Sequence, residues 1–163
     1  MASVNTPIAW TLLPVNRYFE FSGRSGRAEF WWFTLVYTAA GFLLDAIDRA
    51  IGSEFGILGL ILTLGLFIPS LSVTVRRLHD IDVSGWWLLA ALAPAVFFGF
   101  ESSFSALDSE FNGTAPGGSS MVSLSLFVIA CFALVLCMVL PGKKGSNRYG
   151  ADPYDGSGAN AVA

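Results

Sequence analysis

Four long segments of this chain carry almost no charge, and they restrict its possible folds more than any other feature. They run over about residues 30–51, 55–75, 84–100 and 121–140, and the last three contain no Asp, Glu, Lys or Arg. About 20 apolar residues in a helix cross the ~30 Å hydrocarbon core of a bilayer. Backbone groups that face lipid must be satisfied internally, so each segment is expected to be a helix. The sequence predicts an all-α membrane protein with four transmembrane helices.

The composition supports this class and excludes others. Hydrophobic residues make up 54% and charged residues 13% of the 163 residues, whereas a soluble domain is about 25% charged. The net charge of −3 also argues against a nucleic-acid partner. The length predicts one four-helix transmembrane domain over residues 1–154. Residues 155–163 are expected to form a flexible C-terminal tail.

The basic residues orient the four predicted helices. With four spans, eight of the nine Lys and Arg residues fall on one side of the membrane, and the other side keeps Arg49. The positive-inside rule then predicts that both termini are cytoplasmic. The eight residues are Arg17, Arg24, Arg27, Arg76, Arg77, Lys143, Lys144 and Arg148.

The N-terminal stretch has no basic region ahead of an apolar core, so no cleavable signal peptide is expected. Its apolar and aromatic residues predict a short amphipathic helix on the cytoplasmic leaflet. These residues are Trp10, Leu12, Leu13, Tyr18, Phe19 and Phe21.

Three polar motifs adjoin the spans on the predicted cytoplasmic side. They cover residues 21–32, 76–87 and 141–153. The second contains Arg77-Leu78-His79-Asp80 followed by Ser84-Gly85-Trp86-Trp87, and it is the most specific of the three. The spacing of these motifs around four spans resembles the bacterial inner-membrane family catalogued as domain of unknown function 805, over roughly residues 15 to 154.

The resemblance implies a small multi-pass protein of the bacterial inner (plasma) membrane and no particular activity. The family pattern more often has Gly where Asp82 stands and a basic residue where Val83 stands. This loop is therefore less positive here than the family pattern implies.

One hypothesis for these motifs is a site for an anionic lipid head group or another anionic ligand. Arg24 and Arg27 are three residues apart and would share a helix face. Ser84 is a candidate N-cap for the third span, and a helix N-terminus beside arginines favours phosphate or carboxylate binding. The candidate residues are Arg24, Arg27, Arg76, Arg77, His79, Asp80, Ser84, Gly85 and Arg148.

The alternative is that these charges only hold the helices together. Arg77 would pair with Asp80, and Arg76 with Glu29 or Asp82. The paired tryptophans of the first and third spans would form an aromatic belt. Basic residues at cytoplasmic helix ends are also what the membrane topology requires.

Asp45, Asp48 and Arg49 form a second polar group, near the outer end of the first span. Acids inside a membrane are functional candidates by default. They either face the bundle interior as an ion or proton position, or lie at the outer interface.

The chemistry-bearing residues are few. No metal-ligand spacing occurs, Cys131 and Cys137 point to different sides of one helix, and His79-Asp80 has no nucleophile beside it. We therefore expect no catalytic residue, no metal and no cofactor. The sequence predicts a non-enzymatic structural or interaction module with an anionic lipid or ligand site at its cytoplasmic face. Its expected partners are membrane lipids, together with further copies of itself or another membrane protein. The alternatives are an oligomeric small transporter or channel component and a membrane enzyme acting on lipid head groups.

Overall fold

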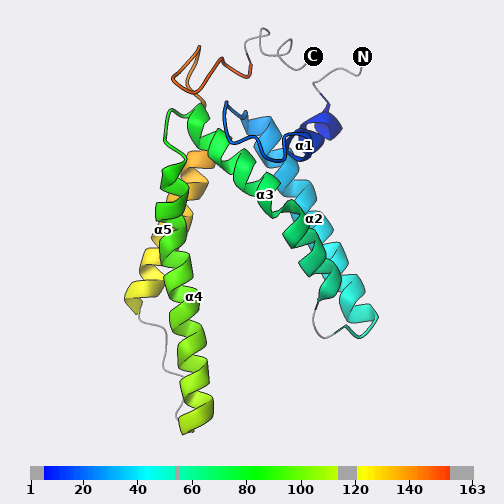
Figure 1. The fold of residues 1–163 in the computed structure, drawn as a ribbon, viewed down its shortest axis with the longest axis vertical. Helices are drawn as coiled ribbons and strands as arrows, with labels where there is room; N and C mark the ends of the chain where they lie inside the picture. Colours follow the sequence, from blue (N-terminus) through cyan, green and yellow to red (C-terminus); the bar gives the residue numbers. More distant parts are fainter. Residues whose placement is uncertain (1–5, 54–55, 114–120, 155–163) are drawn as a thin grey trace. The chain divides into compact units, whose positions relative to one another are not determined.

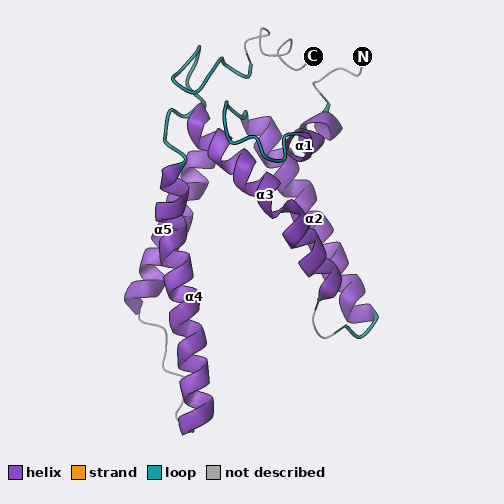
Figure 2. Cartoon of the chain, viewed as in Figure 1, coloured by secondary structure: helices purple, strands orange, loops and turns teal. Residues whose placement is uncertain are grey.

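The computed structural model describes residues 6–53, 56–113 and 121–154, and within these ranges the chain forms helices joined by loops (Figure 2). Five helices follow one another along the chain: α1 (Pro7–Asn16), α2 (Arg27–Ala50), α3 (Ile57–Asp80), α4 (Trp86–Asn112) and α5 (Met121–Val139) (Figure 1). The predicted tail, 155–163, lies outside the described residues.

Helices α2 to α5 are each long and apolar enough to cross a membrane. The prediction of four candidate spans in an all-α protein is therefore confirmed. A short helix also forms near the N-terminus, where one was expected, as α1.

Two helices extend beyond the predicted spans. The second span is predicted to end at 75, and α3 continues to Asp80, where the charges of Arg76, Arg77 and Asp80 are paired and buried. The third span was expected to end at 100, but α4 continues to Asn112.

The extended part of α4 is rich in serine and acids. The hydroxyls of Ser102 and Ser103 donate to the carbonyls of Phe98 and Gly99, both at 2.8 Å, so these two side chains are satisfied within the helix. The helix ends only where Gly113 adopts a left-handed conformation (φ 63°), which glycine allows at little cost.

The described chain divides into two compact units. The first contains α1, α2, α3 and the segment that follows α5. The second, Gly85–Leu140, contains α4 and α5, and the rings of Phe98 and Phe127 stack between these two helices at 5.4 Å.

A tight turn joins α2 to α3 in the first unit. Gly52 (φ 71°) follows the end of α2, and the amides of Gly52 and Ser53 donate to the carbonyls of Arg49 (3.2 Å) and Asp48 (2.8 Å), which is the pattern of a Schellman motif. The turn lets α3 run back along α2. The start of α2 and the end of α3 therefore lie at the same end of this unit (Figure 1).

Candidate functional site

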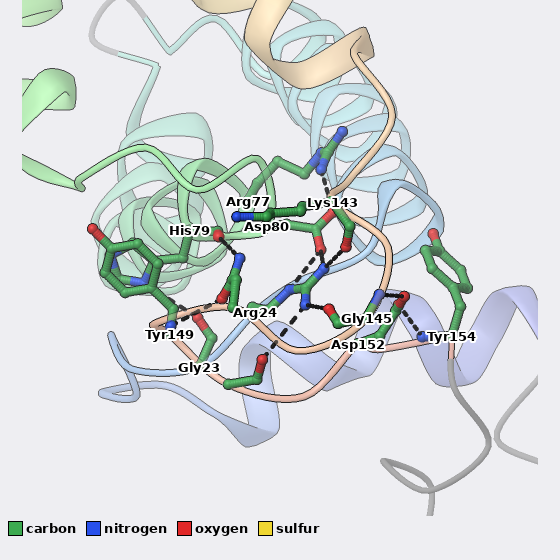
Figure 3. Close-up of polar contacts among 12 residues, drawn as sticks. Gly23, Arg24, Arg77, His79, Asp80, Lys143, Gly145, Tyr149, Asp152 and Tyr154 are labelled. Carbon is green, nitrogen blue, oxygen red and sulfur yellow. Dashed lines mark hydrogen bonds and ion pairs between the residues drawn. The ribbon is translucent and has the colours of Figure 1, made fainter.

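A buried polar cluster occupies the end of the first unit where α3 finishes. We call it the polar end cluster, formed by Arg24, Arg77, His79, Asp80 and the C-terminal segment 141–154 (Figure 3).

Arg24 is at the centre of the cluster. It lies in the loop before α2 and is 6% exposed. Its Nε donates to Asp80 Oδ1 at 3.0 Å, and its NH2 nitrogen lies 2.9 Å from the same oxygen. The guanidinium also donates to three carbonyls of the C-terminal segment: those of Lys143, Gly145 (2.5 Å) and Gly150 (3.5 Å). One side chain thereby joins three segments that are far apart in the sequence.

Asp80 is the acidic partner, at the last residue of α3. Its second oxygen accepts from Arg77, one turn earlier on the helix, at 2.5 Å, and its backbone carbonyl accepts from the Lys143 amide at 2.9 Å. The chain passes so close here that a β-carbon on Gly142 would lie 2.6 Å from the Asp80 carboxyl carbon. Position 142 therefore requires glycine for packing reasons.

His79 contacts the same segment through its ring. The rings of His79 and Tyr149 stack with their centroids 3.8 Å apart and 3° between their planes. The Nδ1 atom of His79 lies 3.2 Å from the carbonyl of Gly23, and the His79 carbonyl accepts from the Asn147 side chain at 2.8 Å. The imidazole is therefore engaged on one face and at one nitrogen by protein groups.

Asp82 connects the loop after α3 to the C-terminal segment on the more exposed side of the cluster. Its carboxylate accepts from Lys143 Nζ at 3.0 Å and pairs with Arg148 Nε at 3.3 Å. The hydrogen bond from Lys143 holds the pKa of the Asp82 carboxyl below its usual value, and the Arg148 charge acts in the same direction. Asp82 has a positive φ of 64°, which explains why a glycine suits this position.

Asp152 closes the C-terminal segment on itself. Its two oxygens accept from the amides of Tyr154 and Gly145, both at 3.0 Å. The hydrogen bond from the Tyr154 amide lowers the pKa of the Asp152 carboxyl, helped by the Gly145 amide and the nearby Arg24 charge. The segment that accepts hydrogen bonds from Arg24 is thus itself ordered by a carboxylate.

A second buried ion pair lies beside the cluster. Arg76 of α3 contacts Glu29 of α2 at 2.9 Å, and both side chains are buried. The Arg76 carbonyl accepts from the amide of Ser25, next to Arg24. The pairings expected under the structural hypothesis, Arg77 with Asp80 and Arg76 with Glu29, are both present.

The candidate anion-site residues separate into two groups. Arg24, Arg76, Arg77, His79 and Asp80 are buried, whereas Arg27 and Arg148 are exposed. Arg24 and Arg27 do not share a helix face as expected, because α2 begins only at Arg27. Ser84 is not the N-cap of α4 either; Gly85 takes that position without a side-chain hydrogen bond.

The outer polar group lies at the opposite end of α2. Asp48 is 2% exposed, and its Oδ2 accepts from the amides of Leu58 (3.0 Å) and Gly59 (3.2 Å) at the start of α3. Asp48 therefore caps a helix other than its own. Asp45 is half-buried, and Arg49 is exposed.

Several cluster residues were missed from the sequence. Gly142, Asn147, Tyr149 and Asp152 contribute packing, hydrogen bonds or stacking, and none was singled out. The available signal was the glycine- and Asn-containing stretch after the last span, from which the sequence analysis selects only Arg148 as a candidate residue. Among the described residues, no group of three or more His, Cys, Asp or Glu side chains could hold a metal ion.

Comparisons with known proteins show a family and several relatives of this chain. The model of the family "protein of unknown function (DUF805)" matches residues 18–151. The chain is 34% identical to the inner membrane protein YhaI of Escherichia coli K12 over 148 residues, covering 91% of this chain and 98% of YhaI. It is 32% identical to inner membrane protein YhaH of the same strain, covering 88% and 95%. No solved structure matches the chain.

Proposed function

The chain belongs to the DUF805 family, and we propose that it is a non-enzymatic structural or interaction module of the bacterial inner membrane. In this proposal the polar end cluster gives the cytoplasmic end of the protein one fixed shape. A partner membrane protein, or a further copy of the chain, would recognise that shape.

One observation carries the proposal: the Arg24 guanidinium is buried and donates to Asp80 and to carbonyls of the C-terminal segment. Its charge and its hydrogen-bonding capacity are directed at the protein itself. Burying such a network is costly unless all members are satisfied, and satisfied networks specify one arrangement of the chain. The cluster therefore acts as a fastening between α3 and the C-terminal segment, and its arginines do not serve a ligand.

The orientation is part of the proposal. Eight of the nine basic residues belong to the end of the first unit that carries the polar end cluster, while Arg49 belongs to the far end of α2. The positive-inside rule assigns the cluster end to the cytoplasm. The first and the last described segments of the chain both belong to that end, so both termini are cytoplasmic in this proposal.

A second candidate function uses the exposed cations instead. Arg27 and Lys144 are exposed and suit electrostatic contact with anionic head groups at the cytoplasmic leaflet. Lys143 and Arg148 would share their charge between lipid and Asp82. This candidate replaces the wider set of anion-binding residues with the exposed ones.

The other hypotheses receive less support. The engagement of the His79 ring by Tyr149 and Gly23 supports a packing role rather than head-group chemistry. One oxygen of the Asp48 carboxylate caps α3, which gives this buried acid a structural role. We therefore propose no catalytic residue.

Native mass spectrometry of the protein released from membranes with its own lipids tests the proposal. We compare the wild type with Arg24→Lys and with the double variant Arg27→Ala/Lys144→Ala. A protein complex or oligomer present in the wild type and in the double variant, but lost in Arg24→Lys, supports the module. A defined anionic lipid lost only in the double variant supports the second candidate instead. The same set of species in all three samples would contradict both.

A further inference from the structure

Residues 6–20, which we call the N-terminal segment, present an apolar ridge. Ile8, Leu12 and Val15 follow one another at helical spacing along one side of α1, and Phe19 follows in the next turn. Their exposed fractions are 73%, 50%, 38% and 77%. The polar end cluster makes no use of this ridge, so its partner has to be identified separately.

Protein groups supply partners for some backbone atoms at both ends of the N-terminal segment. Pro7 opens α1 and has no N–H, and Thr6 Oγ1 accepts from the Ala9 amide at 3.3 Å. Beyond the other end, Ser72 of α3 donates to the carbonyl of Glu20 at 2.5 Å. Internal satisfaction of this kind is what a segment in contact with hydrocarbon requires.

Tyr18 fastens the segment to α3 at a defined point. Its hydroxyl donates to the carbonyl of Gly65 at 2.8 Å. That carbonyl would ordinarily accept from the residue four positions later, but this residue is Pro69, which has no N–H. Tyr18 thus supplies the donor that the proline removes.

The bond between Tyr18 and Gly65 lies well inside α3, far from the end of the helix. Gly65 lies 80 − 65 = 15 residues before the last residue of α3, Asp80, which is about 22 Å along the helix axis at ~1.5 Å per residue. Ser72 lies eight residues before the same end, about 12 Å. The N-terminal segment is therefore attached beside the apolar stretch of a membrane-spanning helix rather than at its tip.

We propose that α1 is seated in the bilayer, with its ridge against the acyl chains of the leaflet next to the polar end cluster. The same unit also exposes apolar side chains on its long helices, among them Val36 of α2 and Phe67 of α3. A water-soluble partner would have to enter the membrane to reach a segment attached at Ser72 and Gly65. The half-exposed Arg17–Glu20 pair (3.7 Å) suits the head-group boundary at the end of α1.

This position of α1 connects the lipid with the part of α3 around Pro69. In the proposal, α1 packs against the acyl chains, and Tyr18, which follows α1, donates to the Gly65 carbonyl. A change in the packing of the leaflet would therefore act on the part of α3 where the helical hydrogen-bond ladder is interrupted.

Depth-dependent fluorescence quenching tests the proposal. Leu12→Cys is prepared in a Cys131→Ser/Cys137→Ser background, labelled with bimane and placed in vesicles of phosphatidylethanolamine and phosphatidylglycerol. Nitroxide is carried in separate samples by the head group, by carbon 5 or by carbon 12 of the acyl chain. We expect carbon 5 to quench Leu12→Cys at least twofold more strongly than the head-group nitroxide. Iodide in the water should have little effect.

Two matched positions make the result interpretable. Val36→Cys, on the exposed face of α2, should be quenched most strongly by an acyl-chain nitroxide. Arg148→Cys, in the exposed C-terminal segment, should be quenched by iodide. Strong iodide quenching of Leu12→Cys would overturn the proposal, because the ridge would then face water. Protection of Leu12→Cys from every quencher would also overturn it, because another protein or a second copy would then cover the ridge. These outcomes do not depend on whether the module proposal holds.

Discussion

Arg24 and Asp80 lie 56 positions apart in the sequence and form a buried, two-nitrogen contact at 3.0 and 2.9 Å. Because the same guanidinium also donates to Lys143, Gly145 and Gly150, this contact determines where the chain goes after its last helix. The predictions below test that arrangement and the turn at the opposite end of α2.

Removing the Arg24 side chain should destabilise the first unit substantially. Arg24→Ala leaves Asp80 with one cationic partner and leaves buried carbonyls without a donor. Loss of one member of a buried pair costs about 3–5 kcal/mol. The change is measured as the shift in unfolding midpoint in detergent micelles. The control, Arg27→Ala, is exposed and should alter stability by less than about 0.5 kcal/mol. Equal effects of both variants would contradict the central role of Arg24.

A methyl group at position 142 should detach the C-terminal segment. Gly142→Ala brings a β-carbon against the Asp80 carboxyl group, so one of the two chains has to move. We expect faster hydrogen–deuterium exchange of the amides between 143 and 152, and faster tryptic cleavage after Lys143 and Lys144. Gly41→Ala is the matched control, since no atom lies within 4 Å of its β-carbon position. Unchanged exchange in Gly142→Ala would show that the segment does not pack as described.

Acid should weaken the attachment at Asp82 and Asp152. Both carboxyls have a pKa below the usual 3.8 in the folded protein, so their contribution to stability is complete above that value. It is lost as the pH falls through the lower folded values. The midpoint of thermal unfolding, followed from pH 7 to pH 3, should therefore fall mainly below pH 4 from this cause. Asp82→Asn should lower the midpoint at pH 7 and reduce the acid-dependent drop. A variant that keeps the full drop would exclude Asp82 as a contributor.

Removing the Asp48 carboxylate should destabilise the start of α3. Asp48→Ala removes the acceptor of the Leu58 and Gly59 amides, and loss of a cap costs about 1 kcal/mol, with a range of roughly 0.5–2. Asp48→Asn keeps an acceptor oxygen and should lose less. Arg49→Ala, next to it but exposed, is the control. Urea unfolding in micelles ranks the three variants, and an Asn variant as unstable as the Ala variant would argue against capping.

Tyr18→Phe should loosen the N-terminal segment without affecting the polar end cluster. The Gly65 carbonyl, which is exposed on the surface of α3, then lacks both its helical donor and the Tyr18 hydroxyl, and an unsatisfied backbone group that faces lipid is costly. Hydrogen exchange should rise in α1 and around Gly65, while the amides of 143–152 stay protected. Exchange that rises equally in both regions would indicate general unfolding instead.

The amino-acid sequence by itself determined the fold class and the four spans. In lipid, a helix is the structure in which a single uncharged run of about 20 residues satisfies its own backbone hydrogen bonds. The fold class therefore follows from these runs without information from hydrophobic periodicity or tertiary contacts. The sequence also predicted the pairing of Arg77 with Asp80, since residues three apart on a helix are neighbours. For Arg76 it offered Glu29 or Asp82, and the structure selects Glu29.

Only the tertiary structure decided how the polar residues are used. Arg24 looked like an exposed cation beside Arg27, because nothing in its own neighbourhood indicates that α2 starts three residues later. Arg24 bonds to Asp80 and to carbonyls of residues 143–150, which are distant in the sequence. Every residue has a backbone carbonyl, so the sequence does not indicate which carbonyls an arginine will contact. The sequence places Asp48 either in the bundle interior or at the outer interface, and only the structure shows that it caps the next helix. Which groups neutralise a buried charge depends on which segments meet in space, and local patterns do not contain that information.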